Sequence, residues 1–142
     1  IAKTFLVSCD NAHALHPNHS EKTDAVNFVT MNGGIVIKES ANQKYTTDAF
    51  SRALFTGVCQ NVNVPVQSFA NRSDVVGGST LGNLSNTQVS VHAVDFGLAQ
   101  LAMHSCFETA GVKDTEYAII ALKEFYETNV QIEEAESVCL EK

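Results

Sequence analysis

The side chains best suited to chemistry are concentrated in residues 7–19. A run of consecutive apolar residues at 5–7 predicts a strand, which leads into Asp10 and then into three histidines. In open α/β sheets, ligands bind at the carboxyl ends of the strands. Asp and His also hold zinc when a water must remain on the metal. The segment therefore predicts a metal site. The alternative is an Asx-turn at Asp10 and Asn11 with solvated histidines, in which Pro17 simply ends the strand.

Lys38 is a second candidate because it follows three β-branched residues at 35–37. A lysine at the end of such a strand is often a solvated edge charge that protects against aggregation. The functional alternative is an ammonium group that projects into a cleft and pairs with a substrate carboxylate. The local pattern leaves both interpretations open.

The loop G-G-S-T at residues 77–80 is a third candidate, because glycine-rich loops can bind phosphate. It lacks the lysine of a G-x-x-x-x-G-K-[ST] motif, and no G-x-G-x-x-G follows a strand. A nucleotide-binding α/β domain is therefore weakly supported. The simpler interpretation is a tight turn that leads into a short helix.

His104 is a fourth candidate because of the residues that follow it. Ser105 and Glu108 fit a capping box, which predicts a short helix that Gly111 ends. His104 would then lie just outside the N-terminus of this helix, where the helix dipole favours a neutral imidazole that can bind a metal. On local grounds, a hydrogen-bonded loop histidine is the alternative.

The pattern along the chain predicts the elements that position these residues. Strands are expected at 3–9, 35–37, 66–69 and 89–96. Helices are expected at 47–62, capped by Thr47, at 80–86, and at 116–128, capped by Asp114 or Thr115. Residues 21–32 show no clear period, and the acidic tail at 129–142 extends the last helix, frays or packs on a neighbouring subunit. This alternation predicts an α/β fold.

Length and composition limit the class of protein. A chain of 142 residues with 44% hydrophobic and 18% charged residues fits one globular domain. The net charge of −7 and the scattered Lys and Arg residues argue against a nucleic-acid partner. The four cysteines form no C-x-x-C pair and indicate reduced thiols of a cytoplasmic protein, and no apolar run reaches the ~18 residues of a membrane helix. Because it opens at Ile1, just before an apolar strand, the chain is expected to be the back part of a longer polypeptide.

Four segments of the sequence resemble the aspartyl aminopeptidase family. Residues 8–18 (S-C-D-N-A-H-A-L-H-P-N) match the family's S-x-D-x-A-H-A-x-H-P-N segment, and the similarity continues at 36–45, 72–78 and 100–105. The segments follow the family's order and cover nearly the whole chain. The resemblance implies that residues 1–142 are the C-terminal part of the catalytic domain of a cytosolic metallopeptidase with two zinc ions. It also implies a three-layer αβα sandwich and assembly into a hollow tetrahedral dodecamer.

The resemblance assigns roles to individual histidines and to one carboxylate. Asp10 and His104 correspond to terminal zinc ligands, one for each ion. Their side-chain oxygen and nitrogen should then lie within about 7 Å of one another. His13 belongs to the substrate-binding residues, whereas His16 and His19 are not expected to bind metal.

The resemblance also implies a substrate pocket. Lys38 and Tyr45 are expected to contact the acidic side chain of the first residue of the substrate. Asp74 is expected to order the loop that follows it, in which Gly77 and Gly78 let backbone amides approach the peptide.

Several parts of the family's active site have no counterpart in the sequence, namely its first histidine ligand, its bridging aspartate and its paired glutamates. We therefore expect the parent enzyme to be a zinc-dependent aminopeptidase that releases N-terminal Asp or Glu, and the 142 residues alone to be inactive. The expected partners are the peptide substrate, the rest of the polypeptide and further copies of the chain. The alternative is a non-catalytic binding or oligomerisation module, which a zinc-dependent peptidase activity would exclude.

Overall fold

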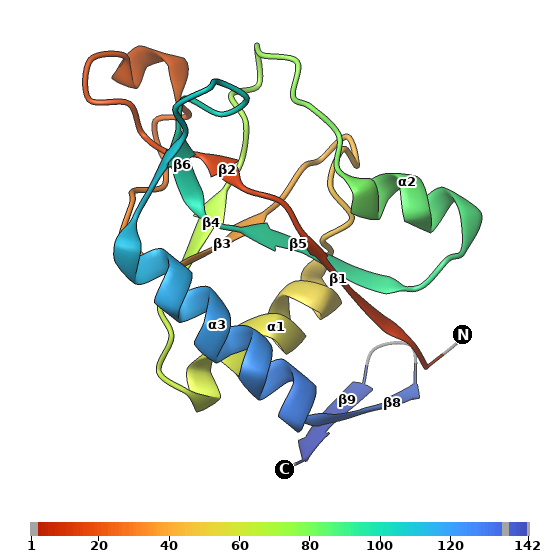
Figure 1. Cartoon of the computed structure of the whole chain (residues 1–142). Helices are drawn as coiled ribbons and strands as arrows, with labels where there is room; N and C mark the ends of the chain where they lie inside the picture. Colours follow the sequence, from red (N-terminus) through yellow and green to blue (C-terminus); the bar gives the residue numbers. More distant parts are fainter. Residues whose placement is uncertain (1–2, 135–136, 142) are drawn as a thin grey trace.

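A four-stranded mixed sheet forms the centre of the structure (Figure 1). The computed structural model describes residues 3–134 and 137–141, and its strand order is β1-β5-β3-β4. The strands are β1 (Phe5–Cys9), β3 (Ile35–Lys38), β4 (Val66–Phe69) and β5 (His92–Gly97). β1 is parallel to β5 and β3 is parallel to β4, whereas β3 and β5 are antiparallel. The predicted strands are confirmed, although β5 begins later than predicted because the preceding helix continues to Gln88.

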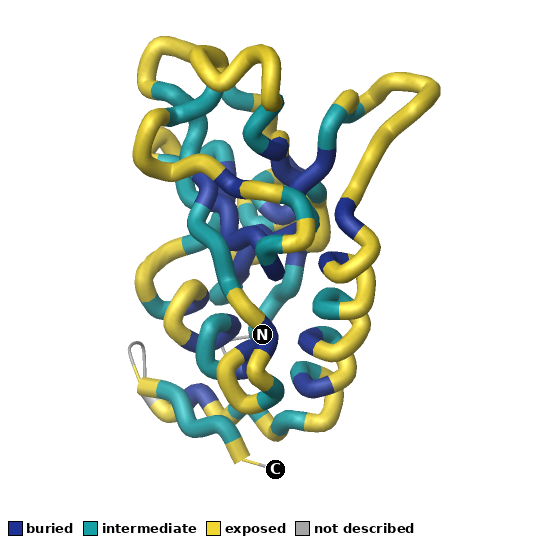
Figure 2. The backbone as a smooth tube through the Cα atoms, turned by 90° about the vertical axis from the view of Figure 1, so that its left-hand side faces the viewer, coloured by how far each residue is buried: buried dark blue, intermediate teal, exposed yellow. Residues whose placement is uncertain are grey.

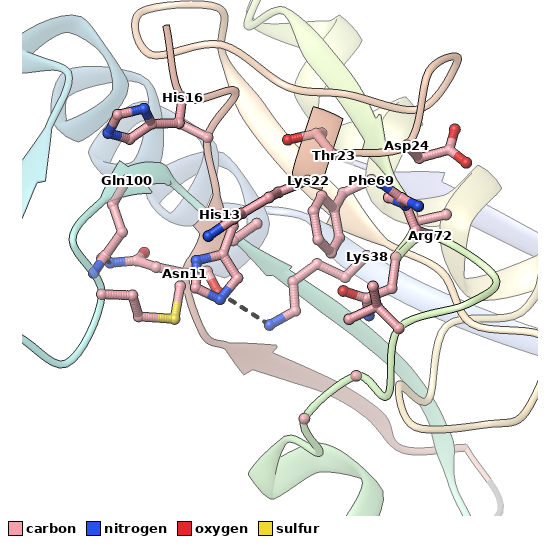
Figure 3. Close-up of a pocket in the computed structure, with 18 of the residues that line it drawn as sticks. Asn11, His13, His16, Lys22, Thr23, Asp24, Lys38, Phe69, Arg72 and Gln100 are labelled. Carbon is pink, nitrogen blue, oxygen red and sulfur yellow. Dashed lines mark hydrogen bonds between the residues drawn. The ribbon is translucent and has the colours of Figure 1, made fainter. Parts of the chain in front are cut away.

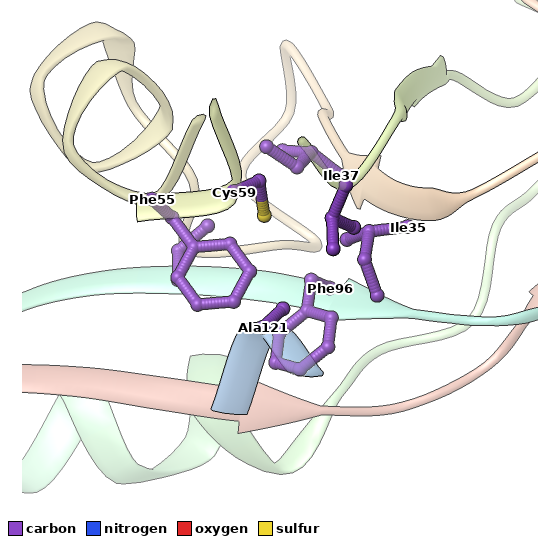
Figure 4. Packing of buried hydrophobic residues seen from close by; sticks show 8 residues of the cluster. Ile35, Ile37, Phe55, Cys59, Phe96 and Ala121 are labelled. Carbon is purple, nitrogen blue, oxygen red and sulfur yellow. The ribbon is translucent and has the colours of Figure 1, made fainter. Parts of the chain in front are cut away.

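Three α-helices cover the two faces of this sheet. They are α1 (Ala49–Asn61), α2 (Leu81–Gln88) and α3 (Val112–Glu127). α1 and α3 contact each other on one face, where they enclose a core that contains Ile35, Ile37 and Phe96 (Figure 4). Side chains alternate between the faces of a sheet, so Ser8 and Asp95 point to the other face and lie against α2. The result is the three-layer αβα arrangement that was expected.

The N-terminus of α1 differs in detail from the prediction. Asp48 caps the helix, because its carboxylate accepts from the Ser51 N–H at 2.7 Å and the Ser51 hydroxyl accepts from the Asp48 N–H at 3.0 Å. Thr47, the predicted cap, instead accepts a hydrogen bond from the Asp95 N–H at 2.9 Å. The threonine therefore ties the start of the helix to the centre of the sheet.

A short helix after His104 was predicted, and this prediction is wrong. Residues 102–108 form turns between β6 (Ala99–Leu101) and β7 (Thr109–Ala110), which pair in an antiparallel manner. On its other side β6 pairs with β2 (Ala12–His13), giving a second, smaller sheet. The Glu108 carboxylate accepts from the His104 N–H at 2.5 Å, so the S-x-x-E pattern closes a turn instead of a helix.

The start of α3 was also predicted too late. The helix begins at Val112 after Gly111, and Asp114 lies in its first turn instead of capping it. Asp114 is fully buried, and its carboxylate accepts from the backbone N–H groups of Asn32 at 2.6 Å and Gly34 at 2.9 Å. The aspartate thus fixes the turn that leads into β3.

The C-terminal segment forms an antiparallel hairpin where an acidic tail was expected at 129–142. Its strands are β8 (Asn129–Glu134) and β9 (Ser137–Glu141). Ile132 is buried, and Leu140 lies close to Gly57 of α1. Residues 135, 136 and 142 lie outside the described part of the chain.

The long exposed loops gather at the end of the molecule opposite the C-terminus, as Figure 2 shows, while the buried backbone lies between them and the hairpin. These loops follow β2, β3, β4 and β6 and surround the candidate site. Among the described residues, no helix has the length and apolar character needed to cross a membrane.

Candidate functional site

One cavity of about 510 Å³ collects almost all the residues predicted from the sequence (Figure 3). It lies at the ends of β1 and β3, under the exposed loops. The predicted residues that line it are Asp10, His13, Lys38, Tyr45, Gly77, Gly78 and His104. Asp74 does not line this cavity. Side chains separated by up to 94 positions in the sequence, from 10 to 104, therefore share one site.

Lys38 is the most unusual of these side chains because it is 2% exposed. Its ammonium donates to Asp10 Oδ2 at 2.5 Å and to the Asn11 carbonyl oxygen at 3.2 Å, and it lies 4.7 Å from the centre of the Tyr45 ring. A buried ammonium group needs such partners, because leaving water without them costs several kcal/mol. The interpretation of Lys38 as a solvated edge charge is therefore wrong.

Asp10 reaches Lys38 across the end of β5. Its N–H donates to the Phe96 carbonyl oxygen at 2.8 Å, which continues the pairing of β1 with β5. The next residue of β5 is Gly97, where an added Cβ would lie 2.0 Å from the Asp10 carbonyl oxygen. The absence of a side chain at Gly97 thus permits the backbone of Asp10 to pass. The Asp10 side chain remains 53% exposed, so its carboxylate faces the cavity while it pairs with Lys38.

His104 enters the cavity from the loop between β6 and β7. Its φ is 67° and that of Ala102 is 55°, both in the left-handed region that residues other than glycine seldom adopt. A turn bond from the Ser105 N–H to the Ala102 carbonyl oxygen, at 3.0 Å, holds this conformation. Because no helix begins at Ser105, the expected effect of a helix dipole on the His104 imidazole does not apply.

Tyr45 is held by a hydrogen bond to its side chain and by the contacts of the residue that follows it. Its hydroxyl accepts from Asn71 Nδ2 at 3.0 Å, and burial raises the pKa of this hydroxyl above its ordinary value. The following residue, Thr46, donates from its N–H and from its hydroxyl to Asp95 Oδ2, at 2.6 and 2.8 Å. Asp95 is fully buried in β5 and therefore ties the Tyr45 segment to the central sheet.

The loop at 71–78 supplies another wall of the cavity. An added Cβ at Gly77 would lie 2.4 Å from Asn71 Nδ2, whereas nothing lies within 4 Å of one at Gly78. Asp74 forms an ion pair with Arg72 at 2.8 and 2.5 Å, and the hydrogen bond from Arg72 holds the pKa of Asp74 below its ordinary value. Arg72 lines the cavity, so Asp74 contributes to the cavity wall by holding the Arg72 side chain in place.

Sequence reasoning gave no role to several polar residues of the site, among them Asn11, Asn71 and Gln100 in the cavity wall and Asp95 in the sheet beside it. Asp95 could have been noticed, because it interrupts an apolar run in a buried strand. The other three depend on partners that are distant in the sequence, such as the Asn11–Gln100 hydrogen bond at 2.5 Å. No local pattern identifies such a pair.

A metal ion requires more donors than these elements provide. Asp10 and His104 line the same cavity and offer an oxygen and a nitrogen, the donor types that zinc accepts. In the described ranges 3–134 and 137–141, however, no three His, Cys, Asp or Glu side chains form a group that could hold a metal. A catalytic zinc takes about three protein ligands, so these residues fit a part of a metal site.

His16 and His19 also line the cavity, with ring centres 5.1 Å apart. His16 Nδ1 accepts from the Asn18 N–H at 3.2 Å, and His19 Nδ1 lies 3.2 Å from a carboxylate oxygen of Glu21. One nitrogen of each ring is thus engaged locally. That neither histidine binds metal stays a prediction.

Comparisons with known proteins match this chain to one family. The profile described as aminopeptidase I zinc metalloprotease (M18) matches residues 1–126. A probable M18 family aminopeptidase 2 of Clostridium novyi is 47% identical over 126 residues, which is 89% of this chain and 29% of that protein. Aspartyl aminopeptidase 1 of Schizosaccharomyces pombe is 42% identical over 134 residues, 94% of this chain and 28% of that protein.

Solved structures show the same similarity. The cryo-EM structure of the Ape4 and Nbr1 complex matches with a TM-score of 0.87 and 43% identity, over 89% of this chain and 24% of that one. The S. cerevisiae mApe1 dodecamer matches with a TM-score of 0.76 and 27% identity, over 87% of this chain and 26% of that one. The chain thus spans less than a third of the length of the relatives it matches.

The close approach of Asp10 to Gly97 can be tested with two equivalent substitutions. We expect Gly97→Ala to lower the free energy of unfolding by about 1–3 kcal/mol, because the new Cβ must displace the Asp10 backbone. Gly78→Ala adds the same group in open space and should change it by less than about 0.5 kcal/mol. Denaturant unfolding measures both, and equal effects would contradict the role given to Gly97.

Proposed function

The chain belongs to the M18 family of zinc metallo-aminopeptidases, and on this premise we propose that its parent protein releases N-terminal residues, preferably Asp or Glu, from peptides. One observation carries the proposal, namely that a carboxylate, an imidazole and a buried ammonium share one cavity. The relative from S. pombe is named an aspartyl aminopeptidase, which supports the acidic preference. A non-catalytic module of the same fold is the alternative.

In this proposal Asp10 and His104 each bind one of two zinc ions, and the remaining ligands come from the rest of the polypeptide. Bound zinc would polarise the scissile carbonyl group and lower the pKa of the attacking water. Asp10 can serve because Lys38 engages its Oδ2, and no hydrogen bond is found for Oδ1 among the described residues. The turn around Ala102 holds the His104 backbone in place.

The ligand assignment is testable in the full-length protein. We expect Asp10→Ala and His104→Ala to weaken zinc binding by more than roughly 100-fold, since even partners of ligands contribute 10- to 100-fold. His16→Ala is the matched control, because His16 lines the same cavity and should leave the zinc content unchanged. Metal analysis after dialysis measures the three variants. Full zinc occupancy in either of the first two would remove that residue from the ligand set.

A second prediction concerns the 142 residues by themselves. We expect no peptidase activity from them, because a reaction without a general base and without a bridging carboxylate loses several kcal/mol of barrier lowering. The measurement is hydrolysis of a chromogenic aspartyl amide by the purified chain with added zinc, with the full-length protein as the positive control. Zinc-dependent turnover by the chain alone, with contamination excluded by mass, would refute the prediction.

Lys38 is proposed to recognise the acidic side chain of the substrate. An ammonium group has three N–H donors, of which Asp10 and Asn11 take two. The third remains for a substrate carboxylate. Tyr45 lies beside the ammonium and completes this part of the cavity. His13, Gly77 and Gly78 are proposed to contact the rest of the peptide. Asp74 is proposed to order the loop of the two glycines through Arg72.

The acidic preference can be tested with Lys38→Met in the full-length enzyme. We expect a loss of about 2–4 kcal/mol in transition-state stabilisation for aspartyl peptides, as for one partner of a buried charge pair. Leucyl peptides should lose much less, so the ratio of kcat/KM for the two substrates is the decisive quantity. It separates recognition from a general disturbance of Asp10, which would affect both substrates.

Lys22→Met provides the matched control, because Lys22 lines the same cavity but is exposed. It removes the same charge and should leave the ratio unchanged. An equal loss on both substrates in Lys38→Met would exclude Lys38 from specificity.

The assembly and location of the parent protein are further parts of the proposal. We propose a homo-oligomer, supported by the dodecameric mApe1 structure and by exposed apolar side chains such as Val76, Phe107 and Val112. A cytoplasmic location is consistent with the free cysteines. Burial raises the pKa of Cys59 to about 12, so this thiol is not reactive.

A further inference from the structure

The proposed function leaves Gln100, in the middle of β6, without a role. Gln100 lines the cavity and is 4% exposed, and in Figure 3 it lies near Asn11, His13 and His16. β6 is paired on both sides, with β2 and with β7. Because pairing with β2 and β7 occupies the backbone of Gln100, its side-chain carboxamide is the group that it presents to the cavity.

The orientation of this carboxamide follows from a donor whose identity is not ambiguous. The Leu98 backbone N–H can only donate, and it donates to Asn11 Oδ1 at 3.0 Å. The Asn11 amide nitrogen must then point the other way, where it donates to Gln100 Oε1 at 2.5 Å. The oxygen of Gln100 is thereby engaged, and its Nε2 faces elsewhere.

Gln100 Nε2 has no acceptor in the part of the chain that the structure describes, although the residue is nearly buried. This nitrogen is nevertheless not one of the fully buried polar atoms that lack a partner. The nitrogen therefore keeps a small accessible surface, and the cavity that Gln100 lines is where that surface lies. An N–H donor without a partner costs about 1–3 kcal/mol, which a ligand or water at this point would recover.

We propose that Gln100 is a substrate-binding residue whose Nε2 donates to a backbone carbonyl oxygen of the bound peptide. The inference rests on the proposed function, because it takes a peptide as the occupant of the cavity. Lys38 supplies the charged donor of the site, whereas a carboxamide suits an uncharged oxygen. Gln100 then contributes to the binding of every peptide, independently of the side chain of its first residue.

Asn11 acts as a positioning residue in this arrangement. In Asn11→Asp, the introduced carboxylate still accepts from the Leu98 N–H. Its second oxygen, however, faces Gln100 Oε1 and repels it. The Gln100 amide turns over, so that its nitrogen binds the carboxylate and its oxygen faces the cavity. The hydrogen bond between the two residues survives, but the donor to the substrate is lost.

The experiment uses the full-length, zinc-loaded enzyme and a leucyl peptide, whose side chain carries no charge. Gln100→Glu keeps the acceptor for Asn11 and replaces the donor by an oxygen, while Asn11→Asp keeps Gln100 and turns its amide. We expect both variants to lower kcat/KM by roughly 10- to 100-fold, mainly through KM, as for a lost donor in a desolvated site. Gln60→Glu makes the same chemical change at an exposed position of α1 and should have no effect.

Two outcomes would overturn the proposal: a wild-type KM for Gln100→Glu, or a loss in Gln100→Glu that Asn11→Asp does not share. A merely structural role of Gln100 predicts the second, because Asn11→Asp preserves the bond between the residues. Unchanged zinc content and thermal midpoint show that the variants are folded. If the wild type cleaves no peptide, the proposed function fails, and calorimetric binding of a leucyl dipeptide still decides the role of Gln100. Weaker binding by Gln100→Glu supports it, and equal binding contradicts it.

Discussion

The ion pair between Lys38 and Asp10 is the constraint on which the site depends. An ammonium group that is 2% exposed requires a nearby negative charge, and the carboxylate that supplies it follows directly after a strand that is not adjacent. β5 separates β1 from β3, so the pair spans the end of β5. This is possible because Gly97 leaves room for the backbone of Asp10. The charge pair therefore depends both on the strand order and on the absence of a side chain at Gly97.

The walls of the cavity are tied to the central sheet by polar contacts. The Asn11 carbonyl oxygen accepts from Lys38, while its side chain joins Leu98 and Gln100. Asp95 holds the residue that follows Tyr45. Such contacts fix side chains before any ligand arrives, which lowers the entropy lost on binding. The loop that carries His104 is built differently, because backbone in the left-handed region and hydrogen bonds within the loop itself determine its shape.

The sequence was informative wherever a local rule had one outcome. Consecutive apolar residues identified the strands, and the resemblance brought Asp10, Lys38 and His104 to one site. It was misleading where a pattern has two outcomes: the S-x-x-E segment after His104 closes a turn, because pairing of β6 with β7 leaves no room for a helix there. Asp114 matched a capping residue, but its carboxylate instead accepts from the Asn32 N–H, 82 residues away in the sequence. The Asn11–Gln100 bond, with a separation of 89 residues, has no local signature at all.

The two roles given to Asp10 are compatible because a carboxylate has two oxygens. Lys38 binds Oδ2, and Oδ1 has no hydrogen-bond partner within the described residues, so a metal and an ammonium need not compete for one atom. Sharing has a consequence, however. If Asp10 binds a metal as proposed, the ammonium would draw negative charge away from the oxygen that faces it, and the hydrogen bond from Lys38 would restrain the rotation of the carboxylate. Under the proposed function, specificity and metal binding thus involve the same carboxylate through two different oxygens.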